Sequence, residues 1–123
     1  MKYVFVYGTL KKGYRLHQYL QKSTFIGEGI LENHIMYVLG WYPGVVKSKS
    51  GSVLGEVYQI DQPTLDILDD VEANGILFQR KPEIITLIEA YPQHIKKTCS
   101  IEAWVYKYLG DVGSFKILES GKF

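Results

Sequence analysis

The segment that organises this sequence is Tyr3-Val4-Phe5-Val6-Tyr7-Gly8-Thr9-Leu10-Lys11-Lys12-Gly13. Its first five residues are aromatic or β-branched, a composition that suits a strand covered on both faces. Gly8 follows at once and would let the backbone turn sharply where the strand ends. We therefore expect a buried strand over residues 3–7 that runs into a tight turn.

The turn after this strand is a candidate ligand site. Backbone N–H groups left unpaired at the end of a strand can form a small concavity that binds anions. Gly8, Thr9 and Leu10 are therefore candidates for holding a carboxylate or a phosphate. The alternative is a tight turn without a ligand, which is common after strands.

Length and composition are typical of one small globular domain. The 123 residues are 46% hydrophobic and 22% charged, which is enough apolar material for a core, so we expect a single domain over residues 1–123. The formal net charge is +1 without a basic block, which predicts neither a nucleic-acid nor a membrane partner. Cys99 has no cysteine to pair with, and the start lacks the apolar run of a signal peptide, so we expect a cytoplasmic location.

The rest of the chain reads as short strands around one clear helix. We expect a short irregular helix over 10–21, a bent or bulged strand pair over 24–38, an aromatic loop over 39–44 and a short strand from 45. A polar turn over 47–52, a strand over 53–60, a helix from Asp61 to about Ala73, and strands over 78–90 and 98–108 joined by a turn at 91–93 should follow. This set predicts an α+β fold: a small mixed β-barrel or strongly curled sheet with one main helix.

The expected helix carries one carboxylate on its apolar face. At about 100° per residue, Leu65, Leu68 and Glu72 fall within one arc, whereas three other acidic residues point away from its centre: Asp66, Asp69 and Asp70. A carboxylate that faces a cavity is partly desolvated, which raises its pKa towards the range useful for proton transfer. The alternative is structural, because a residue in the last turn could swing to solvent or pair with Arg80.

Other functional motifs are absent or incomplete. Gly8 and Gly13 have the spacing of a P-loop, but Tyr14 and Arg15 stand where that motif needs lysine and a hydroxyl residue. The three histidines are scattered without ligand spacing, so we expect no metal ion and no cofactor. Cys99 lies in an expected strand and is interpreted as a small buried hydrophobe.

Four motifs in order carry a family resemblance: Tyr7-Gly8-Thr9-Leu10 with Gly13, Gly55-Glu56-Val57-Tyr58, Leu68-Asp69-Asp70-Val71-Glu72 and Phe78-x-Arg80. Together they resemble the γ-glutamylcyclotransferase-like family, and most closely its short γ-glutamylamine cyclotransferase branch. The similarity covers nearly the whole chain. It implies a small α+β barrel and an enzyme that converts a γ-glutamyl amine, or a related small γ-glutamyl amide, to 5-oxoproline and a free amine.

The resemblance also implies roles for individual residues. Tyr7 to Leu10 match the loop that cradles the substrate, and Glu72 matches the acid/base glutamate. The substrate's own α-amine would attack its γ-carbonyl, so the enzyme needs no nucleophile, and Glu72 would serve as base and then as acid. Three residues depart from the family pattern: Phe78 stands for tyrosine, Ala73 for glycine and Lys122 for a frequent acid. The alternative is therefore a non-catalytic protein that binds a small metabolite in the same pocket.

Overall fold

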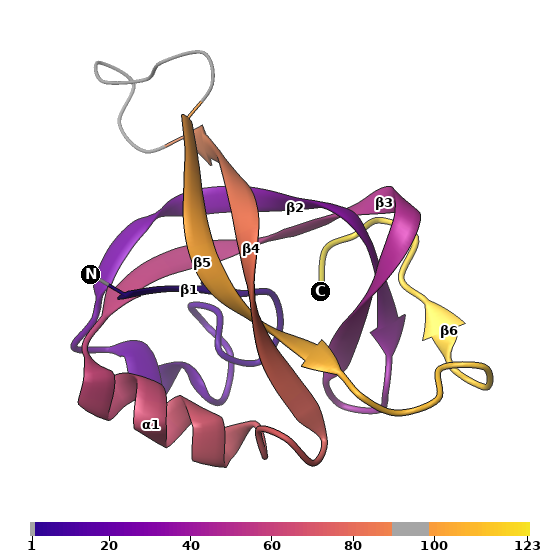
Figure 1. Ribbon diagram of the computed structural model, residues 1–123, viewed down its shortest axis with the longest axis horizontal. Coiled ribbons are helices and arrows are strands. Elements are labelled where there is room, and N and C mark those ends of the chain that lie inside the picture. Colours follow the sequence, from indigo (N-terminus) through magenta and orange to yellow (C-terminus); the bar gives the residue numbers. More distant parts are fainter. Residues whose placement is uncertain (1, 90–98) are drawn as a thin grey trace.

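The computed structural model describes residues 2–89 and 99–123, and the predicted turn at 91–93 lies outside these ranges. The elements in order are β1 (Lys2–Val6), the 3-10 helix η1 (His17–Leu20), β2 (Thr24–Val38), β3 (Pro43–Ile60), α1 (Gln62–Val71), β4 (Phe78–Glu89), β5 (Cys99–Tyr108) and β6 (Lys116–Ile117) (Figure 1). No helix among them is long and apolar enough to cross a membrane.

Five of the strands close into a barrel. The hydrogen-bonded order is β3-β1-β5-β4-β2, and a further pairing between β2 and β3 completes the ring. β6 pairs with the C-terminal end of β2, at Tyr37 and Val38. β1 and β5 are parallel and the other pairs are antiparallel. The predicted α+β fold, a mixed barrel with one main helix, is confirmed.

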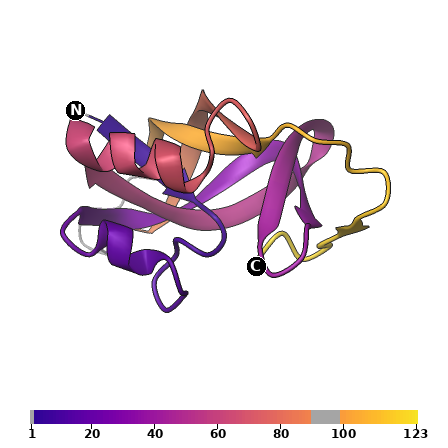
Figure 2. The same cartoon turned by 90° about the horizontal axis from the view of Figure 1, so that it is seen from below.

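β1 is buried on both of its faces, as its composition predicts. Phe5 and Tyr7 point into the barrel core, whereas Val4 and Val6 pack with Leu68 of α1. α1 and the segment that contains η1 lie on the same outer side of the barrel (Figure 2). β1 therefore packs against the barrel interior on one face and against the helical layer on the other.

Two close fits hold β1 and α1 in place. A side chain at Gly55 would lie 2.4 Å from the Val6 carbonyl oxygen, so only glycine lets β3 approach β1 this closely. Asp61 is the N-cap of α1, as predicted, and its carboxylate accepts a hydrogen bond of 2.9 Å from the Thr64 N–H. Hydrogen bonding to the Thr64 side chain, and to a smaller extent to the Thr64 N–H, lowers the pKa of Asp61.

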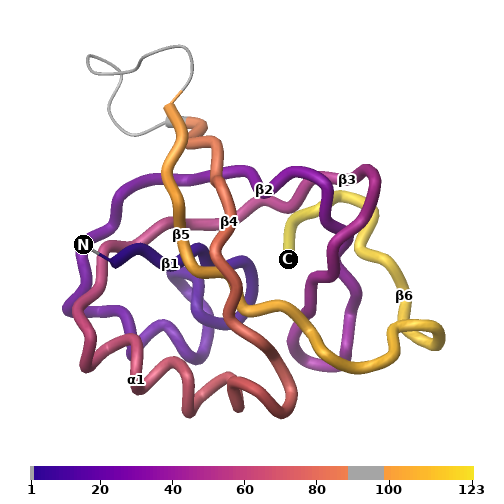
Figure 3. The backbone as a smooth tube through the Cα atoms, viewed as in Figure 1, coloured from indigo at the N-terminus to yellow at the C-terminus, as the bar shows by residue number. Residues whose placement is uncertain are grey.

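The long strands correct several sequence-based boundaries. Residues 24–38 form one strand with bulges, and residues 43–60 form another, so the predicted polar turn at 47–52 is wrong. Its residues stay in β3 because β2 pairs with β3 on both sides of them, and the two strands run side by side (Figure 3). The register places Glu32 opposite Ser52 and His34 opposite Lys47. The extra residues are absorbed as a bulge.

Three smaller expectations are also corrected. The helix expected over residues 10–21 is reduced to η1, because hydrogen-bonded turns occupy the residues before it. α1 ends at Val71, two residues before the predicted end at Ala73. Cys99 is an exposed free cysteine at the start of β5, not a buried one.

Candidate active site

The turn that follows β1 is anchored by the buried phenol of Tyr7. Its hydroxyl donates to the Tyr106 carbonyl oxygen at 2.7 Å and accepts from the Val45 N–H at 3.2 Å. Burial, with a smaller contribution from the charge of Glu72, raises the pKa of Tyr7 well above its ordinary value. The phenol therefore stays protonated and ties the turn to β5 and β3.

Gly8 is required by packing rather than by an unusual backbone conformation. A Cβ at this position would lie 2.7 Å from the Pro43 ring, and Gly8 is not among the glycines with positive φ. The expectation that Gly8 serves to free the backbone for the turn is therefore corrected. The turn itself is closed by a 3.0 Å hydrogen bond from the Lys11 N–H to the Gly8 carbonyl oxygen.

The N–H groups of Gly8, Thr9 and Leu10 are available to a ligand. Among residues 2–89 and 99–123, none of the three has a hydrogen-bond acceptor. Thr9 and Leu10 are nonetheless buried, with exposed fractions of 9% and 3%. Buried N–H groups need an acceptor, so water or a bound ligand must supply it.

Glu56 of β3 supports the far side of the turn. One of its carboxylate oxygens accepts hydrogen bonds from the Lys12 N–H and from the Tyr58 hydroxyl, both at 2.9 Å. Glu56 belongs to the Gly55-Glu56-Val57-Tyr58 motif, but the sequence alone predicted no role for its side chain. The alternation of a strand, which places Glu56 and Tyr58 on the same face, is the signal that could have shown the pair.

A cavity of about 150 Å³ lies where the turn meets α1. Its walls are mainly apolar and aromatic, and the turn supplies four of the residues that line it. The lining comprises Phe5, Val6, Tyr7, Gly8, Thr9, Leu10, Leu16, Trp41, Tyr42, Pro43, Val71, Glu72, Leu77, Phe78 and Tyr106. All five residues predicted for the site therefore line one cavity.

Glu72 is the charged group of this cavity. It caps the C-terminus of α1, where its N–H donates to the Leu68 carbonyl oxygen at 2.9 Å. Within the described part of the chain, its carboxylate forms no hydrogen bond and no ion pair. Burial raises its pKa to about 7. A carboxylate with this pKa can accept and return a proton near neutral pH.

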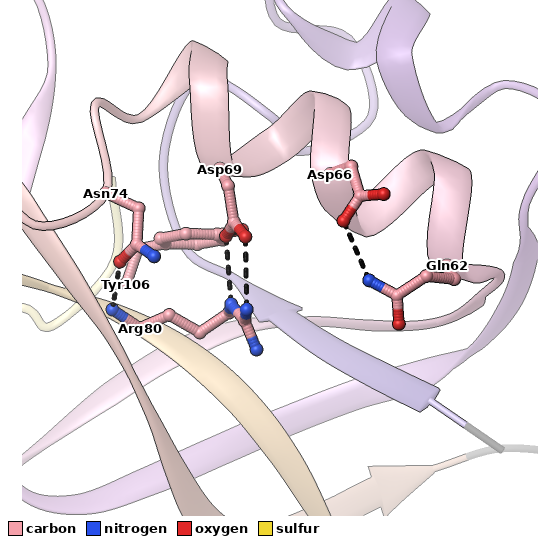
Figure 4. Close-up of polar contacts among 6 residues, drawn as sticks. All are labelled: Gln62, Asp66, Asp69, Asn74, Arg80 and Tyr106. Atoms are coloured by element: carbon pink, nitrogen blue, oxygen red, sulfur yellow. Dashed lines mark hydrogen bonds and ion pairs between the residues drawn. The ribbon is translucent and has the colours of Figure 1, made fainter.

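Arg80, the predicted alternative partner of Glu72, pairs with Asp69 instead. Two guanidinium nitrogens donate to the two carboxylate oxygens at 2.9 and 3.0 Å (Figure 4). The Tyr106 hydroxyl donates to the same carboxylate at 2.7 Å, and the guanidinium lies 4.2 Å from the centre of the Trp104 ring. This cluster of Asp69, Arg80, Tyr106 and Trp104 fixes α1 against β4 and β5 and leaves Glu72 unpaired.

The helix ends in a backbone conformation that favours glycine. Ala73 has a φ of 48°, in the left-handed region. Its N–H donates to the Asp70 carbonyl oxygen and the Asn74 N–H donates to the Asp69 carbonyl oxygen, a pair of bonds known as a Schellman motif. The chain therefore accepts local strain at the residue directly after Glu72.

No group of three or more histidine, cysteine, aspartate or glutamate side chains among the described residues could hold a metal ion. His34 is buried in β2 and His17 lies in η1, so the two do not share an element. The third histidine, His94, lies outside the described residues.

Comparison with known proteins identifies the family of this chain. The family described as Gamma-glutamyl cyclotransferase, AIG2-like matches residues 4–123. The chain belongs to this family. A relative from Methanocaldococcus jannaschii, named as a candidate γ-glutamylcyclotransferase, is 39% identical over 100% of this chain and 96% of its own length. The γ-glutamylcyclotransferase family protein YtfP of Escherichia coli strain K12 is 32% identical over 96% of this chain and 92% of its own.

Solved structures of γ-glutamylcyclotransferase-like proteins share the barrel. An AIG2-like protein from Mus musculus has a TM-score of 0.86 and 25% identity, covering 100% of this chain and 88% of its own. The solution structure of YtfP from Escherichia coli has a TM-score of 0.68 and 32% identity, covering 98% of this chain and 95% of its own. Membership of the family supports an enzyme of the γ-glutamylcyclotransferase type.

Phe78 lies in the cavity wall, at a position where the resemblance described above leads us to expect tyrosine. Its ring is 3% exposed and meets the rings of Tyr42 and Tyr108 edge to face, with centroids 6.2 and 5.8 Å apart. A phenylalanine here adds an apolar surface where a tyrosine would add a hydroxyl. This part of the wall therefore packs without offering a hydrogen bond from residue 78.

Proposed function

We propose that this protein converts a γ-glutamyl amine, or a related small γ-glutamyl amide, to 5-oxoproline and a free amine. The observation that carries the proposal is the unpaired Glu72 carboxylate on a cavity that the Gly8 to Leu10 backbone also lines. The first group can move protons near neutral pH, and the second can hold an anionic or developing negative oxygen. Cyclisation of a γ-glutamyl group requires both.

The reaction needs one group that handles protons twice. The substrate's α-amine attacks the γ-carbonyl carbon, which forms the ring C–N bond, and Glu72 takes the proton that this nitrogen loses. The bond from the carbonyl carbon to the departing nitrogen then breaks. Glu72 returns its proton to that nitrogen, so the free amine leaves and the carboxylate is regenerated.

The turn would supply the electrostatic part of the reaction. The N–H groups of Gly8, Thr9 and Leu10 hold either the α-carboxylate of the substrate or the carbonyl oxygen as negative charge develops on it. Tyr7 keeps these groups in place through its hydrogen bonds to Val45 and Tyr106. Because both reacting atoms belong to one substrate molecule, positioning replaces a covalent enzyme intermediate.

Replacement of Glu72 by Gln tests the mechanism. Release of 5-oxoproline from a panel of γ-glutamyl amides should fall by about 10²- to 10⁴-fold, the usual contribution of general acid–base catalysis. Asp66→Gln serves as the control, because Asp66 is exposed on the same helix and does not line the cavity. Unchanged turnover in Glu72→Gln would overturn the role of this residue.

The same panel separates an enzyme from a binding protein. A protein that only binds a small metabolite would hold one or more of the amides without releasing 5-oxoproline. Phe78 and Ala73, which depart from the family pattern, motivate this second function. Calorimetry of each amide beside the turnover assay distinguishes the two.

A further inference from the structure

The size of the cavity sets which part of a substrate it encloses. An apolar cavity of about 150 Å³ is large enough for one benzene molecule. The cavity beside Glu72 has this volume, and a γ-glutamyl group has more non-hydrogen atoms than benzene, so no room remains inside the cavity for a bulky leaving group. The leaving amine must then extend past the rim.

The rim is aromatic. Trp41 lines the cavity and is 56% exposed, which places it where the cavity opens to solvent. The Tyr42 ring meets the Trp41 ring edge to face, with centroids 4.8 Å apart. Leu16 and Leu77 are partly buried members of the same lining. These four side chains present an apolar surface to whatever leaves the cavity.

The charge at the rim is positive. The Arg15 guanidinium lies 4.3 Å from the centre of the Trp41 ring. Among the described residues, Arg15 pairs with no carboxylate, and Glu72 is the only charged side chain in the cavity lining. A cationic leaving group would therefore meet an unneutralised guanidinium and no carboxylate other than the one that the reaction uses.

We propose that Trp41, Tyr42, Leu16 and Leu77 form a subsite for the leaving amine, and that this amine carries an apolar, preferably aromatic, group without a positive charge. The proposal rests on the function proposed above. Arg15 acts as a specificity determinant at this subsite: it occupies one face of Trp41 and repels cations. The subsite thus selects the amine, whereas the turn and Glu72 act on the glutamyl group.

Four γ-glutamyl amides that share the glutamyl group test the subsite. Their leaving amines are methylamine, pentylamine, 1,5-diaminopentane and phenethylamine, and the second and third differ chiefly by a terminal ammonium. The expected order of kcat/KM for 5-oxoproline release is phenethylamine, then pentylamine, then diaminopentane, with about tenfold between pentylamine and diaminopentane. A flat order, or a preference for the diamine, would overturn the proposal.

Two variants assign the effect to residues. Trp41→Ala should raise KM for the phenethylamine substrate about tenfold more than it raises KM for the methylamine substrate, because methylamine does not reach the rim. Arg15→Glu should raise kcat/KM for the diaminopentane substrate relative to kcat/KM for the pentylamine substrate. Lys49→Glu is the matched control, since Lys49 is exposed in β3 and does not line the cavity. An equal change in Lys49→Glu would overturn the role of Arg15.

Binding separates failure of the subsite from failure of the proposed function. Calorimetry of the four amides with Glu72→Gln measures the subsite without turnover. If wild-type protein releases no 5-oxoproline but the affinities follow the expected order, the proposed reaction is wrong and the subsite stands. If the affinities are equal or reversed, the subsite is wrong whatever the turnover.

Discussion

Asp69 and Glu72 lie three residues apart at the end of α1, yet their surroundings are opposite. The carboxylate of Asp69 accepts three hydrogen bonds, two from Arg80 and one from Tyr106, whereas that of Glu72 faces an apolar cavity without a partner among the described residues. Desolvation destabilises the charge of Glu72 and raises its pKa, whereas the hydrogen bonds of Asp69 hold α1 to β4 and β5. Because Asp69 binds Arg80 and Tyr106, the carboxylate of Glu72 is left without a partner among the described residues.

The largest expected effect concerns the pH dependence of turnover. If Glu72 is the base and its pKa is about 7, kcat/KM should fall about tenfold per pH unit below 7 and be about 100-fold below its plateau at pH 5. Rates of 5-oxoproline release between pH 4.5 and 8.5 provide the measurement. An inflection at pH 4 to 5 would show that Glu72 is solvated like an ordinary carboxylate and would break the comparison with Asp69.

The raised pKa of Glu72 should also appear in stability. The folded protein holds this proton more tightly than the unfolded chain does, so the associated stability is complete below pH 4.5 and is lost as the pH rises through about 7. After allowance for solvent in the cavity, the loss is about 2 kcal/mol. The glutamine in Glu72→Gln does not titrate. The free energy of unfolding of this variant, relative to that of the wild type, should therefore rise by about this amount between pH 4 and pH 8.

Urea unfolding at several pH values measures this gain. Glu119→Gln provides the control, because Glu119 is an exposed residue of the C-terminal segment. Parallel stability curves for wild type and Glu72→Gln would contradict a desolvated carboxylate.

Replacement of Asp69, the carboxylate with partners, should lower the stability of the protein, in contrast to replacement of Glu72. Asp69→Asn replaces one carboxylate oxygen with an NH2 donor, so the bidentate pair with Arg80 is lost and the remaining oxygen is uncharged, which should lower the free energy of unfolding by about 1.5 kcal/mol. Asp66→Asn is the matched control on the same helix, because Asp66 accepts a single exposed bond from Gln62 (Figure 4). Equal losses in the two variants would show that the Asp69 cluster has no special structural weight.

The smallest expected effect lies at the residue that follows Glu72. Ala73→Gly should stabilise the protein by about 1 kcal/mol, because glycine adopts the left-handed conformation without the steric cost of a Cβ. Asn33→Gly, at a φ of 61°, should gain less, since asparagine tolerates this region. Thermal unfolding of both variants tests the order, and a loss of stability in Ala73→Gly would contradict it.

Much of the fold was predictable because it depends on local pattern. The apolar run from Tyr3 to Tyr7 indicated a strand buried on both faces, and Asp61 followed by Pro63 indicated the start of α1. The predicted turn at 47–52 was wrong because this segment has the polar composition of a turn but belongs to a strand. Only its pairing with β2 on both sides, which is a long-range interaction, keeps it inside β3.

The candidate site was predictable to the extent that periodicity reveals it. Glu72 stood out because it shares an arc with Leu65 and Leu68. The pairing of Arg80 with Asp69 could not be read from the helix alone, because Asp69 lies off the centre of the apolar face and its partners come from β4 and β5. The aromatic rim at Trp41 depends equally on a loop whose position is set by packing.

By itself, the sequence determined the strand, the turn and the helix that supply the candidate groups, since these follow from composition and period. Tertiary structure alone decided which of them meet. It placed Glu72 and the Gly8 to Leu10 backbone on one cavity, and it paired Asp69 with Arg80. The reason is physical: the charge state of a carboxylate depends on burial and on partners that are distant in sequence.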